Sequence, residues 1–502
     1  MKLEYRIESN KIYLRTLNDK DATEKYCEWL NDSNVNKYLE TKKANIDEIK
    51  NYILEKNESC NCLFLGIFDK SNDAHIGNLK LEPIDFENKK ATFSIMVGDR
   101  KYWNRGIGTE ATSLIINYAW NTLKLDSIDL GVVADNKRAI RVYEKVGFRV
   151  IMIVKKAIKH EDKVFDKVIM KITNIHPQMK FLIIGCGSIG KRHISNLIKI
   201  GYTNIEIFDL DNSRMEDIKK NFNVKKSNNV FDSIKNNDNI IICTPNNLHR
   251  EYILAAAQNN KNIFVEKPIL DNLENIESIK NAIEKNNIKL QVGYNLIYHP
   301  LILKIKEILD NKELGDIYGA RLEYGSYLPN WRPNTEYWTS YSAKKSMGGG
   351  ILLDAIHEIN YSVYLFGRMK KLFCFANKNS DLNINTEDNA ELLLKSTKDY
   401  TINIHLDYLQ RKPNRTIKII CNKGNIEADI NKNLLRIIEE HETKKYEIEY
   451  DYNETYIEEI TSFISSIVFG KKIIMSLDEG IYDVRLVLSA KESSDKGVMI
   501  EL

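Results

Sequence analysis

The spacing of hydrophobic and polar positions changes twice along the chain. Up to residue 173, short apolar runs alternate with amphipathic stretches, and apolar positions from Ala111 to Ala119 recur every three or four residues, as on one helix face. Residues 179–297 repeat a buried strand followed by an amphipathic helix, which predicts a doubly wound parallel sheet. After about residue 315 apolar and polar positions alternate, which predicts an α+β domain with a large, mostly antiparallel sheet.

The same pattern locates the expected elements. The first stretch predicts helices near 22–30, 109–122 and 136–144, and strands at 11–17, 63–68, 76–81, 91–97, 127–133 and 164–172. The second predicts strands at 180–185, 204–209, 239–245, 262–268 and 289–294. The third predicts strands at 401–406, 416–421 and 434–439.

A chain of 502 residues is too long for one ordinary hydrophobic core, so its length alone leads us to expect about three domains. A short polar segment containing Pro177 precedes Met179, after which a buried strand runs into a glycine turn as at the start of a separate gene. The predicted domains are therefore 1–173, a linker at 174–178, 179–297 and 298–502.

Composition excludes several classes of partner. A net charge of +3 gives no reason to expect nucleic acid or an anionic membrane, and no apolar run approaches the ~20 residues of a membrane span. The N-terminus lacks the apolar core of a signal peptide. The seven cysteines are scattered, and Cys60 and Cys62 have no partner pair, so we expect reduced thiols, no metal and a cytoplasmic protein.

A glycine turn between the predicted strand 91–97 and the helix 109–122 is the first candidate site. Its glycines let backbone N–H groups converge at a helix N-terminus, which is an arrangement that binds phosphate. On its own such a turn is a weak signal. Its residues are Arg105, Gly106, Ile107, Gly108 and Thr109.

Together with the downstream stretch 132–148, this turn resembles the GNAT acetyltransferase superfamily over residues 8–173. The resemblance implies that the turn holds the pyrophosphate of acetyl-CoA. It also implies that the strand 91–97, including Met96 and Val97, splays open so that its backbone pairs with the cofactor arm. Asn136 would help to hold that arm, and Tyr143 would protonate the departing thiolate.

An amine attacks a thioester only after losing its proton, so the reaction needs a general base or a water chain. Glu82 and Asp85 are the candidate bases in this stretch, with Glu82 preferred. The alternative interpretation is that both are solvated loop carboxylates.

A Gly-x-Gly-x-x-Gly run follows a buried strand and opens a helix, and Asp209 lies 19 residues after its last glycine. This context is typical of a dinucleotide-binding fold, in which the acid accepts hydrogen bonds from the ribose. A carboxylate there repels a 2′-phosphate, so NAD is favoured over NADP, although Arg192 and Arg214 lie close in sequence. The cofactor-binding residues of the run are Gly185, Gly187, Ser188, Ile189 and Gly190.

Two further motifs, 244–249 and 265–268, make residues 179–502 similar to the Gfo/Idh/MocA oxidoreductases. The resemblance places Lys267 between nicotinamide and substrate. It also matches 341–360 to the glycine-led catalytic helix of the family. Further residues assigned to the cofactor are Thr244, Pro245, Asn247, His249 and Glu266.

Asp354 and His357 are three residues apart, so we expect them on one face of a single helix, where they would suit a proton relay. His357 would act as acid and base during hydride transfer, with Lys267 assisting. Asp354 would orient the substrate or the imidazole. The alternative for His357 is a core histidine.

An aromatic and basic segment precedes this helix, and such residues stack on sugar rings or meet phosphates. Core packing is the alternative interpretation. The substrate-binding candidates are Tyr294, Trp331, Arg332, Tyr341 and Lys344.

The two resemblances together predict a bifunctional enzyme that combines NAD-dependent redox chemistry on a sugar carbon with acetyl-CoA-dependent N-acetylation. The small-molecule substrate would be an amino sugar or nucleotide sugar of surface-glycan biosynthesis. Alternatively, the first domain acetylates a protein N-terminus or is a non-catalytic module, or the second uses NAD without net redox. By resemblance we expect a homodimer or homotetramer.

Overall fold

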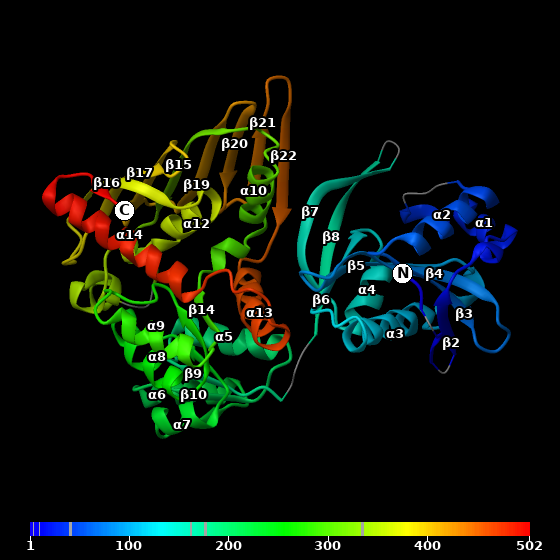
Figure 1. Ribbon diagram of the computed structural model, residues 1–502, viewed down its shortest axis with the longest axis horizontal. Coiled ribbons are helices and arrows are strands. Elements are labelled where there is room, and N and C mark those ends of the chain that lie inside the picture. Colours follow the sequence, from blue (N-terminus) through cyan, green and yellow to red (C-terminus); the bar gives the residue numbers. More distant parts are fainter. Residues whose placement is uncertain (4, 10, 40–42, 161–162, 175–177, 333–335) are drawn as a thin grey trace. The chain divides into compact units, whose positions relative to one another are not determined.

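The computed structural model describes the chain except residues 4, 10, 40–42, 161–162, 175–177 and 333–335. It contains two compact units, Met1–Asn174 with Ile448–Asp451, and Ile175–Glu447 with Tyr452–Leu502 (Figure 1). In the described part of the chain, no helix is both long and apolar enough to cross a membrane.

The first unit is built on one twisted sheet. Its neighbouring strands are antiparallel except for the parallel pair β5–β6. Predicted strands in this stretch match observed ones. In spatial order the strands are β1 (Ile7–Glu8), β2 (Ile12–Thr16), β3 (Leu63–Asp69), β4 (His75–Asp85), β5 (Lys90–Val97), β6 (Ser127–Val133), β8 (Lys163–Thr173) and β7 (Arg149–His160).

Helices cover this sheet. The predicted apolar stripe of α3 (Ile107–Asn121) is buried in the core at Ala111, Ile115 and Ala119. Side-chain caps start the other helices: Thr23, Asn45 and Asn136 each accept a backbone N–H of the first turn. These helices are α1 (Glu24–Asn31), α2 (Ile46–Glu58) and α4 (Lys137–Val146).

A six-stranded parallel sheet opens the second unit, which confirms the predicted doubly wound fold. Its spatial order is β11 (Lys225–Lys226), β10 (Ile205–Phe208), β9 (Phe181–Ile184), β12 (Asn239–Ile242), β13 (Asn262–Glu266) and β14 (Leu290–Gly293). The helices along this stretch are α5 (Ser188–Lys199), α6 (Asn212–Asn221), α7 (Val230–Asn236), α8 (His249–Gln258) and α9 (Ile276–Lys285).

The rest of the second unit is an α+β domain on a mostly antiparallel sheet, as predicted; only β15 and β18 pair in parallel among its described strands. The order is β23 (Ile500–Glu501), β16 (Met369–Asn377), β17 (Asn389–Ser396), β18 (Thr401–Asp407), β15 (Ile317–Gly325), β19 (Asn414–Cys421), β20 (Gly424–Asp429), β21 (Leu434–Ile438) and β22 (Thr443–Glu449). Its helices are α10 (Pro300–Asp310), α11 (Ile351–Asp354), α12 (Ile356–Phe366), α13 (Asn453–Phe469) and α14 (Leu477–Lys496).

Helix α13 belongs to the α+β stretch of the sequence but packs into the core of the parallel sheet. Ile460, Phe463 and Ile464 are buried among residues of β9, β12 and β13, and the Phe463 ring lies 5.8 Å from that of Phe264. The dinucleotide-type core is therefore completed by residues far beyond the predicted boundary at 297.

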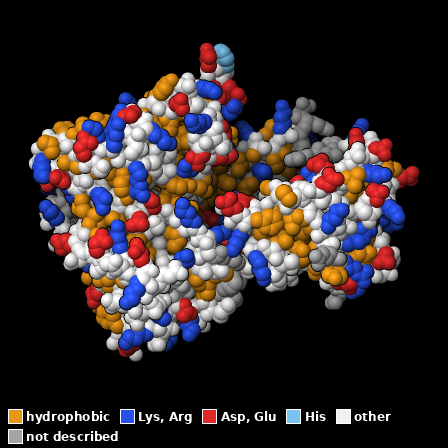
Figure 2. Space-filling view, in the orientation of Figure 1, with side chains coloured by type: hydrophobic (Ala, Val, Ile, Leu, Met, Phe, Trp, Pro, Cys, Tyr) orange, Lys and Arg blue, Asp and Glu red, His pale blue; other side chains and the backbone are white. Residues whose placement is uncertain are grey.

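Charged side chains of both signs are interspersed over the face shown in Figure 2, which fits the small net charge of +3. Large single-sign patches, which would steer a polyanion, do not appear on that face.

Candidate functional sites

A gap between two parallel strands marks the candidate acetyl-transfer site. β5 pairs with β6 only from Lys90 to Thr92, and the described strands provide no partner on that side for residues 93–97. The Val97 carbonyl faces the gap, because it accepts from the Trp103 indole at 2.8 Å rather than from β4. Alternate residues of a strand face the same side, so the N–H of Ile95 also points into the gap. This is the splay expected for pairing with a cofactor arm.

The glycine turn lies at the N-terminus of α3. Gly106 has a φ of +82°, and a Cβ there would meet nothing within 4 Å. A cavity of about 490 Å³ adjoins the turn, with Lys11, Lys70 and Arg105 in its wall beside Asp69. Three cations next to a helix N-terminus suit a phosphate group.

Tyr143 is 7% exposed and packs its ring against Phe93 and Phe148. Burial raises the pKa of Tyr143 to about 12, so the hydroxyl keeps its proton at neutral pH and can act only as a donor acid. Asn136 uses its side-chain oxygen to cap α4 on the Ala139 N–H, at 3.2 Å.

The two candidate bases are already engaged. The Glu82 carboxylate forms ion pairs with Lys56 at 2.8 Å and with Lys80 at 2.6 Å. Burial raises the pKa of Glu82, but the two ion pairs outweigh it and the net pKa is lowered. Asp85 accepts the backbone N–H and the amide of Asn88, which together lower its pKa. A carboxylate with a lowered pKa is a weaker proton acceptor, so this geometry favours a water chain over either residue.

The second glycine turn joins β9 to α5. Gly185 has a φ of +99°, and a Cβ on it would lie 2.6 Å from the Cys243 carbonyl oxygen. A Cβ on Gly190 would lie 2.0 Å from the Gly185 oxygen, whereas one on Gly187 would meet nothing within 4 Å. Gly187, Ser188 and Ile189 thus present open backbone at the start of α5, where a pyrophosphate would lie.

Asp209 follows β10, and its carboxylate accepts the Cys186 N–H at 2.7 Å, which ties it to the glycine turn. The Arg214 guanidinium lies 3.7 Å from the same carboxylate. A carboxylate next to the ribose position favours NAD, and the nearby arginine keeps NADP as a testable alternative.

The motifs at 244–249 and 265–268 lie side by side. We expected His249 to contact the cofactor, but in the structure it bonds to the backbone of both motifs. Its ring is 1% exposed, and its nitrogens lie 2.9 Å from the Thr244 carbonyl and 3.1 Å from the Pro268 carbonyl. It ties two loops together and leaves no ring nitrogen for a cofactor. The Thr244 hydroxyl is buried without a partner among the described residues, which leaves it available. Pro245 and Asn247 lie in the same loop, and the neighbouring Asn246 donates to the Gly348 carbonyl.

Lys267 joins the cofactor half to the catalytic helix region. Its ammonium donates to the backbone carbonyl of Asp354 at 2.8 Å. In a continuous helix that carbonyl would accept the Glu358 N–H, which instead bonds to Ala355 at 3.2 Å. The helix therefore breaks at Ala355 into α11 and α12. The expectation of Asp354 and His357 on one face of a single helix is wrong for this reason.

His357 lies in the first turn of α12 and is buried. Burial, with the cations of Lys267 and Arg415, holds its pKa well below the ordinary value, so the imidazole is neutral in the folded protein. Its Nδ1 has no hydrogen-bond partner among the described residues. The Tyr294 ring stands edge-on to it, with ring centroids 6.0 Å apart.

Asp354 is bound by a residue that sequence analysis did not select. The fully buried Tyr408 donates its hydroxyl to the Asp354 carboxylate at 2.6 Å. Trp331 packs edge-on against Tyr408, and its indole donates to Ser326. Tyr408 lies 54 residues from Asp354 with no local motif around it, so only the fold brings the two together.

The remaining substrate candidates are less enclosed than Asp354. Arg332 is exposed and stacks over the Tyr341 ring at 5.5 Å. The Asp354 carboxylate, after burial, raises the pKa of Tyr341, which places these two groups near each other. Lys344 is half-buried at the end of the same segment.

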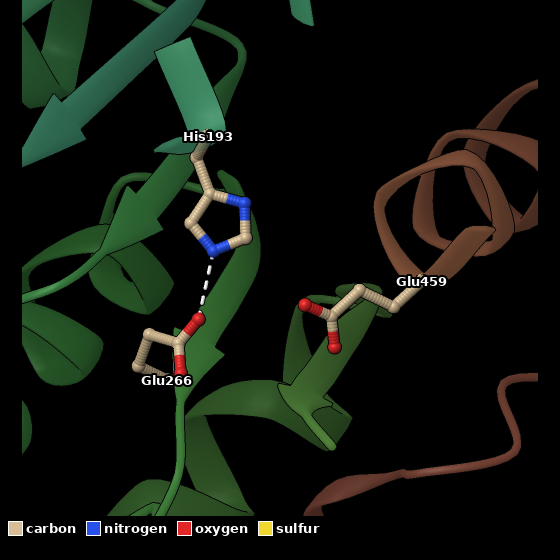
Figure 3. A group of neighbouring side chains, drawn as sticks. All are labelled: His193, Glu266 and Glu459. Atoms are coloured by element: carbon tan, nitrogen blue, oxygen red, sulfur yellow. Dashed lines mark hydrogen bonds and ion pairs between the residues drawn. The ribbon is translucent and has the colours of Figure 1, made fainter. Parts of the chain in front are cut away.

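Three buried side chains from different elements, one of them Glu266 next to Lys267 in the chain, lie together (Figure 3). His193 of α5 hydrogen-bonds to one carboxylate oxygen of Glu266 of β13, at 2.7 Å. The Glu459 carboxylate of α13 points toward this pair, and burial and Glu266 raise its pKa well above the ordinary value. All three residues are enclosed and the imidazole is already paired, which favours a protonated Glu459 over a bound metal.

These features define an acetyltransferase-type fold followed by a dinucleotide-binding oxidoreductase fold. Family models agree: "Acetyltransferase (GNAT) domain" matches residues 11–149, "Oxidoreductase family, NAD-binding Rossmann fold" matches 179–294, and "GFO/IDH/MocA C-terminal domain" matches 302–427. The chain is thus a GNAT domain joined to a member of the GFO/IDH/MocA oxidoreductase family.

Among curated relatives, the myo-inositol 2-dehydrogenase of Thermotoga maritima is 25% identical over 341 residues, which is 64% of this chain and 98% of that protein. The uncharacterized oxidoreductase YrbE of Bacillus subtilis is 30% identical over 190 residues, 37% of this chain and 53% of its own length. The chain spans about half the length of several such relatives.

Solved structures share the fold of the second unit. GenD2 from gentamicin A biosynthesis, in complex with NAD, has a TM-score of 0.58 at 16% identity and covers 66% of this chain and 98% of its own. Levoglucosan dehydrogenase in complex with NADH has a TM-score of 0.59 at 19% identity, covering 64% and 98%.

Proposed function

We propose that the chain is a bifunctional enzyme of amino-sugar metabolism. Its second unit transfers a hydride between a sugar carbon and NAD, and its first unit moves an acetyl group from acetyl-CoA to an amine. The observation that supports the redox assignment is the convergence of Lys267, Asp354 and His357 at the break between α11 and α12, where Lys267 bonds to the Asp354 carbonyl and its charge acts on His357.

In the proposed oxidation, the neutral His357 accepts the hydroxyl proton of the substrate. Lys267 donates to the same oxygen and is held in position by the Asp354 carbonyl. Asp354, fixed by Tyr408, orients a neighbouring hydroxyl. NAD supplies the hydride acceptor when bound, and the open backbone at Gly187 to Ile189 would hold its pyrophosphate.

In the proposed acetylation, the outward N–H groups of β5 align the cofactor arm and the α3 N-terminus holds its phosphates. Tyr143, which stays protonated, delivers a proton to the departing thiolate. A water chain removes the amine proton, because Glu82 is committed to two lysines.

The amino-sugar assignment rests on joining the two activities. Fused enzymes usually act in one pathway, and a sugar oxidised or reduced at carbon and acetylated at nitrogen is an acetamido sugar. Named relatives that act on inositol and on glucose 6-phosphate support a polyol or sugar for the redox half. Nucleotide linkage fits the exposed Arg332 and half-buried Lys344.

The test is isothermal titration with NAD, NADP and acetyl-CoA, followed by amino-sugar screening for NADH and free CoA. Gly187→Asp places a carboxylate where a Cβ meets nothing, with Gly187→Ala as its matched control; Gly106→Asp is matched by Gly106→Asn, which tolerates the same backbone. Each Asp variant should lose only its own ligand, while both controls keep it.

Failure of acetyl-CoA to bind the wild-type protein would leave the first unit as a non-catalytic module. Binding without turnover of any amino sugar, but with acetylation of peptide N-termini, would replace the amino-sugar proposal. Product formation without net NADH would indicate internal recycling of the nicotinamide.

A further inference from the structure

A separate pocket lies beside α12, and none of its lining residues belongs to the glycine turn of α5 or to the aromatic and basic segment before α11. It has a volume of about 270 Å³ and is walled by α12, the loop before α14 and α14 itself. Ile474 at 39% exposure and the Arg368 side chain at 42% lie at its mouth. The least exposed of its lining residues is Asp483, which is 1% exposed.

On the side that faces the candidate active site, Asp483 accepts a hydrogen bond from α12. The Asn360 amide, one turn beyond His357 on α12, donates to its carboxylate at 2.7 Å. The Tyr294 hydroxyl lies near the same carboxylate without an ordinary hydrogen bond to it, and burial followed by Asp483 raises the pKa of Tyr294.

The other charged groups around Asp483 interact mainly with partners other than Asp483. On the solvent side Arg368 pairs with Glu479 at 2.7 Å and stacks on Tyr482. Burial raises the pKa of Asp483 to about 7; Asn360 and Tyr294 oppose the rise, Glu479 adds to it, and Arg368 opposes it. A carboxyl with this pKa exchanges protons with water at neutral pH.

Tyr294 also touches the proposed catalytic base. Its ring stands edge-on to His357 with centroids 6.0 Å apart. The Tyr294 hydroxyl and His357 Nδ1 are both buried and both lack a hydrogen-bond partner among the described residues. Buried polar atoms of this kind are rare in folded proteins and call for a specific explanation.

We propose that Asp483 and Tyr294 form the proton outlet of the redox site, which connects His357 to water in the pocket between α12 and α14. This inference rests on the proposed oxidoreductase function. It explains how an imidazole enclosed by protein can return to its neutral state after each turnover.

The proton count closes. During oxidation the hydride goes to the nicotinamide and the hydroxyl proton goes to the ring nitrogen of His357 that faces the substrate. His357 then releases the Nδ1 proton to the Tyr294 oxygen, directly or through one water, as the Tyr294 hydroxyl proton passes to the Asp483 carboxylate. Asp483 finally gives a proton to water in the pocket. The imidazole is then neutral with its proton on the substrate-facing nitrogen, which is the tautomer that reduction starts from when it runs the same path in reverse. Before another oxidation, that nitrogen loses its proton to water entering as the product leaves, and Nδ1 takes up a proton from water.

The neighbouring acid on α12 is a poorer outlet. Glu358 follows His357 directly, but it is fully buried and paired with Arg415 at 2.7 Å. Protonating it would leave the Arg415 guanidinium buried without its partner. Asp483 faces a pocket and has no such pairing.

The test combines kinetics with infrared spectroscopy on the full chain. Asp483→Asn should lower kcat at least about tenfold at pH 7, with KM changed less than about twofold, and should remove the neutral-pH ionisation from the kcat profile. Asp478→Asn is the matched control, since it lies on the same helix with its side chain 77% exposed, and it should behave as wild type. Asn360→Asp added to Asp483→Asn returns a carboxyl to the same hydrogen-bonded pair and should recover most of the rate.

The infrared measurement can be made without any substrate. A protonated-carboxyl C=O signal that titrates near pH 7 should disappear in Asp483→Asn and shift in Tyr294→Phe. The outlet is overturned if NADH forms at wild-type rates in Asp483→Asn, or if no such signal exists. If no sugar yields NADH with the wild type, the oxidoreductase proposal fails, and the titration of the infrared signal still decides whether Asp483 exchanges protons and senses Tyr294.

Discussion

The two candidate sites differ in what they are made of. In the first unit the proposed chemistry depends on main-chain groups, because β5 separates from β6 after Thr92 and Gly106 is the N-cap of α3. In the second unit it depends on side chains drawn from distant segments, such as Lys267, Asp354 and Tyr408. A main-chain site tolerates many substitutions but no loss of an N–H, whereas a side-chain site fails when one atom is removed.

The largest effect should come from Lys267→Met. The variant keeps most of the side-chain length but loses the ammonium, which bonds to the Asp354 carbonyl and in our proposal assists proton transfer. NADH formation should fall about 10²- to 10⁴-fold while NAD binding by titration is retained. Lys261→Met, on the surface of the same half, is the control. Retained activity in Lys267→Met would remove this residue from the mechanism.

Tyr143→Phe should have a smaller effect in the first unit. Removing the hydroxyl that we propose as the proton donor to the thiolate should lower kcat for acetyl transfer roughly ten- to a hundredfold, with KM for acetyl-CoA unchanged. Because burial raises the Tyr143 pKa to about 12, wild-type activity should show no loss from this group up to pH 9. Tyr5→Phe, whose ring is 83% exposed, should be silent. A rise in KM with unchanged kcat would instead indicate a binding role.

Ile95→Pro tests the main-chain nature of the first site. Proline removes the N–H that faces the gap without removing a ladder bond to β4, so acetyl-CoA affinity should fall about tenfold by titration. Ile95→Val keeps the N–H and should bind as wild type. Equal losses in the two variants would show that the side chain, not the backbone, makes the contact.

Glu459→Gln should have the mildest effect, on stability alone. Burial raises the Glu459 pKa, so the folded state holds a proton that the unfolded chain releases, and this contribution is lost as pH rises above about 4.5. The variant should therefore gain Tm relative to wild type between pH 5 and pH 9, as followed by calorimetry. Exposed Glu440→Gln should show no such trend. A Tm difference that is independent of pH would mean that Glu459 is ionised in the fold.

The pattern of apolar residues predicted most strands of the parallel sheet and, in the antiparallel sheet, β18, β19 and β21, because those runs are buried on at least one face. It did not predict β7, β15, β16 or β17. It did not predict α2, whose buried positions are only Ile49 and Ile53, too narrow a stripe to stand out. The motif residues were found because each is local in sequence. Tyr408, Asp483 and the helix break at Ala355 were not, because each results from a contact across many residues: a hydroxyl, a carboxyl and an ammonium reaching a distant group.

The packing of α13 against the parallel sheet has a consequence for how this chain can be divided. A fragment ending at residue 297 would contain every cofactor motif yet leave Phe181, Ile183 and Phe264 without the apolar cover of Ile460 and Phe463. Such a fragment should aggregate rather than bind nucleotide. Recombination that preserves the dinucleotide-type core must therefore keep α13 together with the parallel sheet, so the boundary at residue 297 is not a place where the chain can be divided.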